Sequence, residues 1–343
     1  MWNNFINPRE LPYLFQRLRR EPALARMVLS RLPLTGRGRV RAAWAHTESV
    51  AKQWWDIPAV VERWNRMISG DPSVGPCPYV MGKYLRGRER LRGLSLGCGG
   101  GTKEMEWVAG GAFAAMDAYD LSERRILDAR TEAARRGLGE SIRFHVGDVY
   151  AIRMDDDVYD VIIADNALHH LTPLEPLMRR IHDSLAPDGT FFVNEFIGPS
   201  RFQWTDRQID AANKLLSLLP ARYRMLVGSR HARLPVIRPS RLGMILKDPS
   251  EAVESSRIMP LLHEVFDVRE VRGYGGAILH LLFAGIAHHF VAPDEEGLRL
   301  LETCFAAEDA LLKSGEVGHD FVVAVCGKRR NAAVPSAAGL PAR

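Results

Sequence analysis

The sequence predicts an α/β fold built on a doubly wound, mainly parallel sheet. Short apolar runs alternate with helical segments between about residues 89 and 197. One of these runs, Val158–Ala164, is apolar on both faces, which is typical of a buried parallel strand. Alternation of strands with helices produces crossover connections, and these make neighbouring strands parallel.

The first half of this region contains three expected strands. They are Leu91–Leu96, Phe113–Tyr119 and Ile142–Val146. A helix is expected between the second and third strands, because Ser122 is a suitable N-cap and Gly137 a suitable C-terminal stop.

The second half begins with the fourth strand, Val158–Ala164. An amphipathic helix is expected at Leu174–Leu185, and a turn at Ala186–Gly189 because it contains Pro-Asp-Gly. Thr190–Phe196 is expected as the fifth strand. Further along the chain, the apolar run Leu281–Phe290 predicts a buried helix.

Composition excludes several classes of protein. The 343 residues include 46 basic and 41 acidic ones, and the formal net charge of +5 is too small to indicate a nucleic-acid partner by itself. No apolar run reaches the roughly 18 residues of a membrane span, and the first residues lack the pattern of a signal peptide. The four cysteines form no C-x-x-C pair, which indicates neither a zinc site nor a disulfide framework. We therefore expect a soluble, cytoplasmic protein without a membrane span.

Polar residues or glycines follow four successive strands, and open parallel sheets bind ligands at the carboxyl ends of their strands. The first strand leads into Gly97–Gly101. The second ends at Asp120, and an acid about 20 residues after such glycines accepts hydrogen bonds from ribose hydroxyls. Asp148, after the third strand, is suited to accept from an exocyclic amine such as that of adenine, and Asn166 follows the fourth. These four positions together predict a nucleoside site.

The spacing G-x-G-x-G, with the segments DLSERRI, GDV and LAPDG, resembles the class I S-adenosylmethionine-dependent methyltransferases over about Arg90–Glu195. The resemblance implies a seven-stranded Rossmann-like sheet with an antiparallel last strand at Phe321–Val325, an N-terminal helical arm and a C-terminal helical lid. It also implies S-adenosyl-L-methionine as cofactor, with S-adenosyl-L-homocysteine as product and no metal. The cofactor-binding residues it implies are Gly97, Cys98, Gly99, Gly101, Asp120, Leu121, Asp148, Val149 and Asn166. One position departs from the family, which usually has an acid two residues before the first glycine, where this chain has Ser95.

Two residues are candidates for a general base. His169 follows the fourth strand and titrates near neutrality; in many family members a histidine here only supports the loop. Glu195 ends the fifth strand, and the alternative is that it accepts hydrogen bonds from a nearby loop. Asp165 and Glu195 offer oxygen ligands to a divalent cation, but Phe196 stands where metal-dependent relatives have Asn, so no metal is expected.

The acceptor is expected to contact residues outside the core. The candidates are His170, Phe202, Trp204, Tyr274 and His280. His170 is alternatively a structural histidine, and Phe202 and Trp204 alternatively pack a lid helix on the core. The domain boundaries that we predict are 1–88 for the arm, 89–197 for the cofactor-binding core, 198–265 for the lid, 266–328 for the final strands and 329–343 for a disordered tail.

The arm allows different interpretations. Arg17–Arg41 contains eight Arg and one Glu, which favours either an anionic partner or a solvated helix face. Trp54, Trp55 and Trp64 are interpreted as anchors that pack the arm against the core or against a second subunit, as in a homodimer.

The function predicted from the sequence is methyl transfer to a small or medium acceptor. A natural product of secondary metabolite biosynthesis, a sugar or a glycan intermediate fits, and oxygen is favoured over carbon or nitrogen as the methylated atom. The alternatives are an RNA methyltransferase that uses the basic arm, and a cofactor-binding protein without turnover. Asp165–Leu168 lacks the Asn/Asp-Pro-Pro-aromatic motif, which argues against amino methylation of a flipped base.

Overall fold

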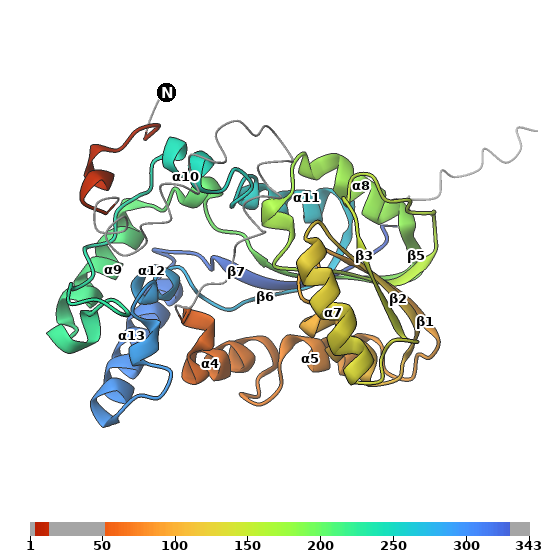
Figure 1. Ribbon diagram of the computed structural model, residues 1–343, viewed down its shortest axis with the longest axis horizontal. Coiled ribbons are helices and arrows are strands. Elements are labelled where there is room, and N and C mark those ends of the chain that lie inside the picture. Colours follow the sequence, from red (N-terminus) through yellow and green to blue (C-terminus); the bar gives the residue numbers. More distant parts are fainter. Residues whose placement is uncertain (1–3, 14–51, 330–343) are drawn as a thin grey trace, which may run out of the picture.

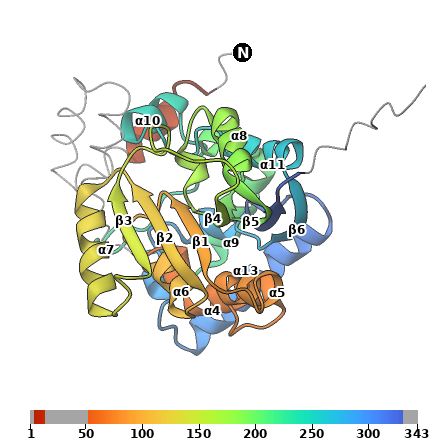
Figure 2. The same cartoon turned by 90° about the vertical axis from the view of Figure 1, so that its right-hand side faces the viewer.

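A seven-stranded sheet of order β3-β2-β1-β4-β5-β7-β6 runs through the molecule (Figures 1 and 2). The computed structural model describes residues 4–13 and 52–329. β1 to β5 are parallel, and β7 is antiparallel to both β5 and β6. The strands are β1 (Leu91–Leu96), β2 (Phe113–Asp120), β3 (Ile142–Val146), β4 (Tyr159–Asp165), β5 (Leu185–Phe196), β6 (Asp267–Gly273) and β7 (Phe321–Gly327). The predicted fold class and the antiparallel last strand are confirmed.

Helices cover both faces of the sheet. The α-helices are α4 (Pro58–Ser69), α5 (Pro76–Tyr84), α6 (Thr102–Ala109), α7 (Glu123–Arg135), α8 (Leu174–Ser184), α9 (Asp206–Leu218), α10 (Arg241–Lys247), α11 (Ile258–Val265), α12 (Leu279–Phe283) and α13 (Glu295–Lys313). α8 and α11 lie on one face, and α4 and α5 on the other (Figure 1). α9, α12 and α13 lie together beyond the carboxyl end of β5.

β4 shows why the central strands read as continuous apolar runs. Ile162 and Ala164 face the core under α8 and α11, whereas Val161 and Ile163 face the larger core on the other side. All four side chains are fully buried. Since alternate residues of a strand point to opposite faces, burial on both faces requires an apolar residue at every position.

Local signals placed the boundaries of α7 correctly. Ser122 is the N-cap of α7, and Gly137, just beyond its end, has a φ of 70°. Thr205 caps α9 and forms a capping box with Gln208.

Two local predictions were wrong. The segment predicted as a turn at Ala186–Gly189 lies inside β5, and the pairing of β5 with β4 shifts there, from Tyr159↔Leu185 to Val161↔Thr190. Pro-Asp-Gly therefore produces a bulge in a long strand instead of ending it. The run predicted as one buried helix is α12 followed by a separate 3-10 turn at Ala287–His289, because Gly285 adopts a φ of 78° between them.

The segment after residue 265 contains, besides α12 in the run predicted as helical, one long helix that was not predicted, α13, between β6 and β7. The Arg-rich segment 17–41 and the tail from 330 lie outside the described residues. Among the tryptophans of the arm, Trp54 is buried, whereas Trp55 is 52% exposed. Over the part of the chain that the structure describes, no helix has both the length and the apolar character of a membrane span.

Candidate active site at the carboxyl ends of the strands

Three glycines shape the loop after β1. Gly97, Gly99 and Gly101 have φ angles of 75°, 54° and 72°, which only glycine adopts at little cost. A Cβ atom at Gly97 would lie 2.7 Å from Cβ of Ala167, and one at Gly101 would lie 2.4 Å from the Phe144 ring. The first contact brings the ends of β1 and β4 together, and the second seats the start of α6 against β3.

Asp120 holds this loop through its carboxylate. Oδ2 accepts a hydrogen bond from the backbone N–H of Gly99 at 2.9 Å, and Oδ1 accepts from that of Ser122 at 2.8 Å. The side chain is half-buried. Each carboxylate oxygen has a second acceptor position, so these bonds are compatible with acceptance from ribose hydroxyls.

The ends of β3 and β4 carry two further predicted residues. Asp148 Oδ1 accepts from the backbone N–H of Tyr150 at 2.9 Å. Asn166 is exposed, has a φ of 54°, and donates to Asp165 Oδ1 at 2.8 Å. A left-handed conformation is uncommon for residues other than glycine, and such strain gathers at functional sites. The conformation of Asn166 therefore marks the end of β4 as a functional candidate.

The remaining predicted cofactor residues flank this loop and the strand ends. Val149 is buried and Leu121 half-buried. Burial of Cys98, helped by the charges of Glu104 and Asp120, raises the pKa of its thiol well above the usual value. The Cys98 thiol is therefore neutral and is not a nucleophile.

His169 and Glu195 form a buried pair. Glu195, at the end of β5, is fully buried and accepts from the backbone N–H groups of Ala167 and Leu168, both at 2.5 Å. Its other oxygen lies 2.6 Å from His169 Nδ1. A carboxylate can only accept here, so the network assigns the neutral-ring proton to Nδ1 and leaves Nε2 as the basic nitrogen. Burial lowers the pKa of His169, but the charge and hydrogen bond of Glu195 outweigh it, and the pKa is raised overall.

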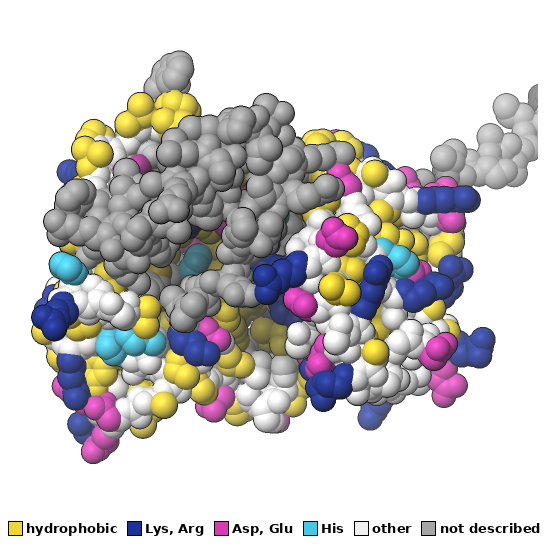
Figure 3. Space-filling model, viewed as in Figure 1, with side chains coloured by type: hydrophobic (Ala, Val, Ile, Leu, Met, Phe, Trp, Pro, Cys, Tyr) yellow, Lys and Arg dark blue, Asp and Glu magenta, His cyan; other side chains and the backbone are white. Residues whose placement is uncertain are grey.

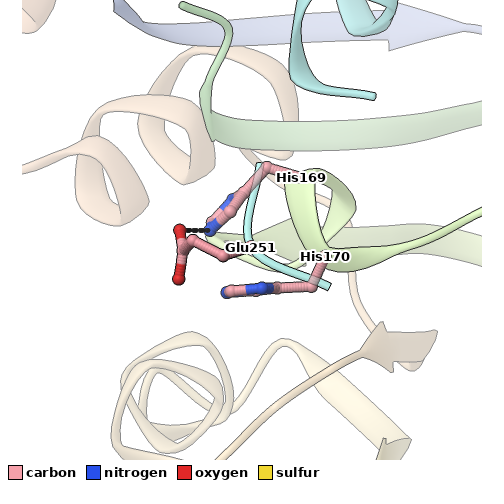
Figure 4. Close-up of side chains that lie close together, drawn as sticks. All are labelled: His169, His170 and Glu251. Atoms are coloured by element: carbon pink, nitrogen blue, oxygen red, sulfur yellow. Dashed lines mark ion pairs between the residues drawn. The ribbon is translucent and has the colours of Figure 1, made fainter. Parts of the chain in front are cut away.

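Glu251 faces the other side of His169 (Figure 4). Its Oε1 lies 4.0 Å from His169 Nε2, and the His170 ring lies 4.0 Å from the His169 ring, centroid to centroid. His169, His170 and Glu251 together offer two nitrogens and one oxygen within 4.8 Å of one another. Burial, His169 and the nearby Arg125 guanidinium lower the pKa of His170 well below its usual value. Because Arg125 also repels a cation, we assign no metal to this group.

Three of the residues predicted to contact the acceptor meet in one aromatic cluster. We use this name for Trp54, Phe196, Phe202, Trp204, His280 and Phe321. Phe202 and Trp204 are stacked with ring centroids 5.0 Å apart, and Phe202 lies 5.7 Å from His280. His280 Nδ1 and Trp54 Nε1 are buried without a hydrogen-bond partner among the described residues. Burial, chiefly, lowers the pKa of His280 to about 4, so this ring is neutral.

Tyr274 and His170 lie apart from the centre of this cluster. The Tyr274 hydroxyl donates to Asn194 Oδ1 at 2.6 Å, and the Asn194 amide donates to Asp165 Oδ1 at 3.0 Å. Tyr274 therefore has a structural partner in β5, although its ring lies 5.8 Å from that of Phe321. The His170 ring packs against that of His169.

Comparison with known proteins identifies the core. Residues 94–189 match the family model described as a methyltransferase domain. This match covers the glycine loop, the ends of β1 to β4 and the start of β5, which carry the predicted cofactor residues and His169, whereas Glu195 and the aromatic cluster lie outside it. The chain carries a class I S-adenosylmethionine-dependent methyltransferase domain.

Individual relatives of this methyltransferase domain are distant. A sterol 24-C-methyltransferase of Aspergillus fumigatus is 28% identical over 137 residues, which are 38% of this chain and 36% of that protein. The chain thus matches about a third of the length of that relative.

The solved structures that resemble this chain are also distant from it in sequence. The chain aligns with the [4+2]-cyclase SpnF at a TM-score of 0.44 and 14% identity, over 82% of this chain and 98% of that one. It aligns with a geranyl diphosphate methyltransferase in complex with GPP and sinefungin at a TM-score of 0.45 and 10% identity, over 78% and 83%. The assignment of the methyltransferase domain rests on the family match and on the strand order observed here.

Residues of the candidate site that the sequence analysis did not assign to it include Phe196 and Glu104. Phe196 ends β5 directly after Glu195, so the rule that ligands bind at strand ends could have found it. Glu104 lies in the first turn of α6, where an acid is common for helix stability alone. Trp54 and Phe321 join the aromatic cluster from distant segments, and no local pattern marked them.

Proposed function

We propose that this protein is an enzyme that transfers a methyl group from S-adenosylmethionine to an oxygen atom of a small or medium acceptor. A natural product, a sugar or a glycan intermediate fits this description. The observation that carries the proposal is the His169–Glu195 pair, which leaves a basic nitrogen next to the strand ends of a methyltransferase domain. Methylation of a hydroxyl benefits from a base, whereas a preformed nucleophile such as an amine needs less help.

The residues present fit the cofactor. A Cβ atom built at Gly100 would meet nothing within 4 Å, so the glycine loop borders open space. Asp120 retains acceptor positions beside that loop. β1 and β4 are adjacent, and the strand order reverses between them, which is where open α/β sheets bind their ligands.

The protein's own contribution is positioning and proton transfer. S-adenosylmethionine supplies an activated methyl group on a sulfonium. Asp120 and the glycine loop hold the nucleoside, and Asp148 is suited to orient the adenine. Holding acceptor and donor in line lowers the barrier by several kcal/mol without a covalent intermediate. His169 Nε2 takes the proton of the acceptor hydroxyl, and Glu195 stabilises the imidazolium that forms.

The aromatic cluster supports a ring-shaped or apolar acceptor. Phe196 lies between the two parts of the site, since its ring centroid is 6.3 Å from that of His169 and 5.2 Å from that of Phe202. The unpaired His280 Nδ1 and Trp54 Nε1 offer hydrogen bonds to polar atoms on such a molecule. Buried polar atoms of this kind usually have a partner, and we propose that the acceptor supplies it.

The experiment that tests the proposal uses a cofactor with an isotopically labelled methyl group. Purified protein is incubated with small-molecule and RNA fractions of the native cell, and the products are resolved by mass spectrometry. We expect label in the small-molecule fraction on oxygen. Label in RNA would support the alternative that uses the basic arm, and cofactor binding without label in either fraction would support a non-catalytic protein. On the face shown in Figure 3, charges of both signs are mixed over the described surface, which gives no preference for RNA.

A further inference from the structure

A buried carboxylate faces the position where the family's acid is missing. Ser95, two residues before Gly97, donates from Oγ to Glu104 Oε1 at 2.8 Å. Glu104 comes from the first turn of α6 and is only 3% exposed. Its second oxygen, Oε2, is buried without a hydrogen-bond partner among the described residues.

This pair lies at the point where the sheet reverses its strand order. Ser95 in β1 is paired with Ile163 in β4, two residues before Asp165. The glycine loop joins β1, which carries Ser95, to α6, which carries Glu104. Burial raises the pKa values of Cys98 in that loop and of Cys77 in α5, and the charge of Glu104 adds to both effects.

An unpaired carboxylate oxygen in this position is costly. A buried polar group without a partner destabilises the folded state, and it does so more strongly when it is charged. Such an atom in a native site indicates a ligand or a water that completes the network. The methionine part of S-adenosylmethionine carries an ammonium group, which supplies both N–H donors and the opposite charge.

We propose that Glu104, held by Ser95, binds the ammonium group of the cofactor. It would thereby replace the acid that the family usually has in β1. This assignment rests on the proposed function and adds to it a residue of α6 that binds one group of the cofactor. Glu104 is a binding residue and takes no part in proton transfer from the acceptor.

The charges around Glu104 agree with a cation at this place. Lys103 on α6 is paired with Asp165 at the end of β4, so its charge is already matched. Burial raises the pKa of Glu104 to about 7; Ser95 opposes this effect, Asp165 adds to it and Lys103 opposes it. The Cys77 and Cys98 thiols have raised pKa values and are neutral. A bound ammonium therefore favours the ionised form of Glu104 and releases a proton near neutral pH.

The test compares two ligands that differ only in the amino-acid part. S-adenosylhomocysteine carries the ammonium group, and 5′-methylthioadenosine lacks it. By isothermal calorimetry, Glu104→Gln is expected to weaken S-adenosylhomocysteine by about 10- to 100-fold, the value of a hydrogen bond to a charged group. Binding of 5′-methylthioadenosine is expected to change less than about threefold and also reports that the variant is folded. An equal change for both ligands would overturn the proposal.

Two further variants sharpen the result. Ser95→Asp in the Glu104→Gln background returns a carboxylate to β1 and is expected to recover most of the lost selectivity for S-adenosylhomocysteine. Glu106→Gln, two residues further along α6 and exposed, is the control on the same helix and should leave both affinities unchanged. If Glu104→Gln does not fold, Glu104→Asp replaces it, and the same selective loss is expected. Failure of the unmodified protein to bind either ligand would contradict the proposed function itself, which a failure confined to Glu104 would not.

Discussion

Replacing Glu195 by Gln tests whether His169 is a general base. The buried carboxylate accepts four hydrogen bonds, from His169 Nδ1 at 2.6 Å, from the N–H groups of Ala167 and Leu168 at 2.5 Å, and from the N–H of Phe196 at 3.2 Å. A Gln side chain keeps one accepting oxygen for the two backbone groups. Its NH₂ group then faces His169 Nδ1 and can only donate to it. The imidazole must then adopt the other tautomer, with its proton on Nε2. This nitrogen can no longer accept the proton of the acceptor hydroxyl.

The expected loss follows from these contacts. One charge-assisted hydrogen bond is lost, which corresponds to about 1.5–3 kcal/mol of stability. The tautomer change removes general base catalysis, which contributes about 10²- to 10⁴-fold to the rate. In the unmodified protein the raised pKa of His169 makes activity increase with pH above 6.5, because only the neutral ring accepts a proton. Without the Glu195 charge, the effect of burial is no longer opposed and the pKa of His169 falls. The increase of activity with pH then occurs at lower pH.

The assay is kcat as a function of pH, once a methyl acceptor has been found, together with cofactor affinity. Glu195→Gln should lower kcat while the Kd for S-adenosylhomocysteine changes little. Asp183→Asn provides a matched control, because Asp183 pairs with His182 at 3.0 Å on α8, outside the strand ends. An unchanged kcat and an unshifted pH profile in Glu195→Gln would refute the assignment of His169 as the base.

Three further predictions concern cofactor binding, packing and pH. Asp120→Asn should weaken S-adenosylhomocysteine by about 10- to 100-fold in calorimetry, since a charged acceptor is lost; an unchanged Kd would contradict its ribose-binding role. Gly101→Ala should lower the melting temperature by several degrees, because its Cβ would lie 2.4 Å from the Phe144 ring at a φ of 72°, whereas Gly100→Ala, with open space around it, should not. Burial raises the pKa of Asp320 from 3.8 to about 7, so the folded state binds a proton more tightly than the unfolded chain. The free energy of unfolding therefore falls as pH rises from about 4 to 7, by at most about 4 kcal/mol from this group. Asn cannot titrate, so chemical denaturation of Asp320→Asn should show a free energy of unfolding that depends less on pH.

The sequence predicted the cofactor half of the site because its signals are local. An apolar strand followed by Gly97–Gly101, and acids at Asp120 and Asp148, are each visible within a few residues. The structure adds the physical reasons, such as the contact of Gly97 with Ala167 and the bond from Gly99 to Asp120.

The part that could not be predicted depends on contacts between distant segments. Glu104 is an ordinary acid in the first turn of a helix until the fold buries it against Ser95. The bulge in β5 arises because the sheet continues through Pro-Asp-Gly, which taken alone favours a turn. In both cases tertiary packing overrides a local preference.

The same difference explains why the acceptor is harder to name than the cofactor. The nucleoside is expected to contact the ends of β1, β2 and β3, which belong to the core shared by this class of domain. The aromatic cluster instead combines the arm, the end of β5, the lid, α12 and the start of β7, through Trp54, Phe196, Phe202, His280 and Phe321. Phe196 connects the aromatic cluster with His169, because it follows Glu195 on the strand whose carboxylate orients His169. We therefore expect changes in the additions around the core to alter which acceptor is bound, while β4 and β5 keep the base in place.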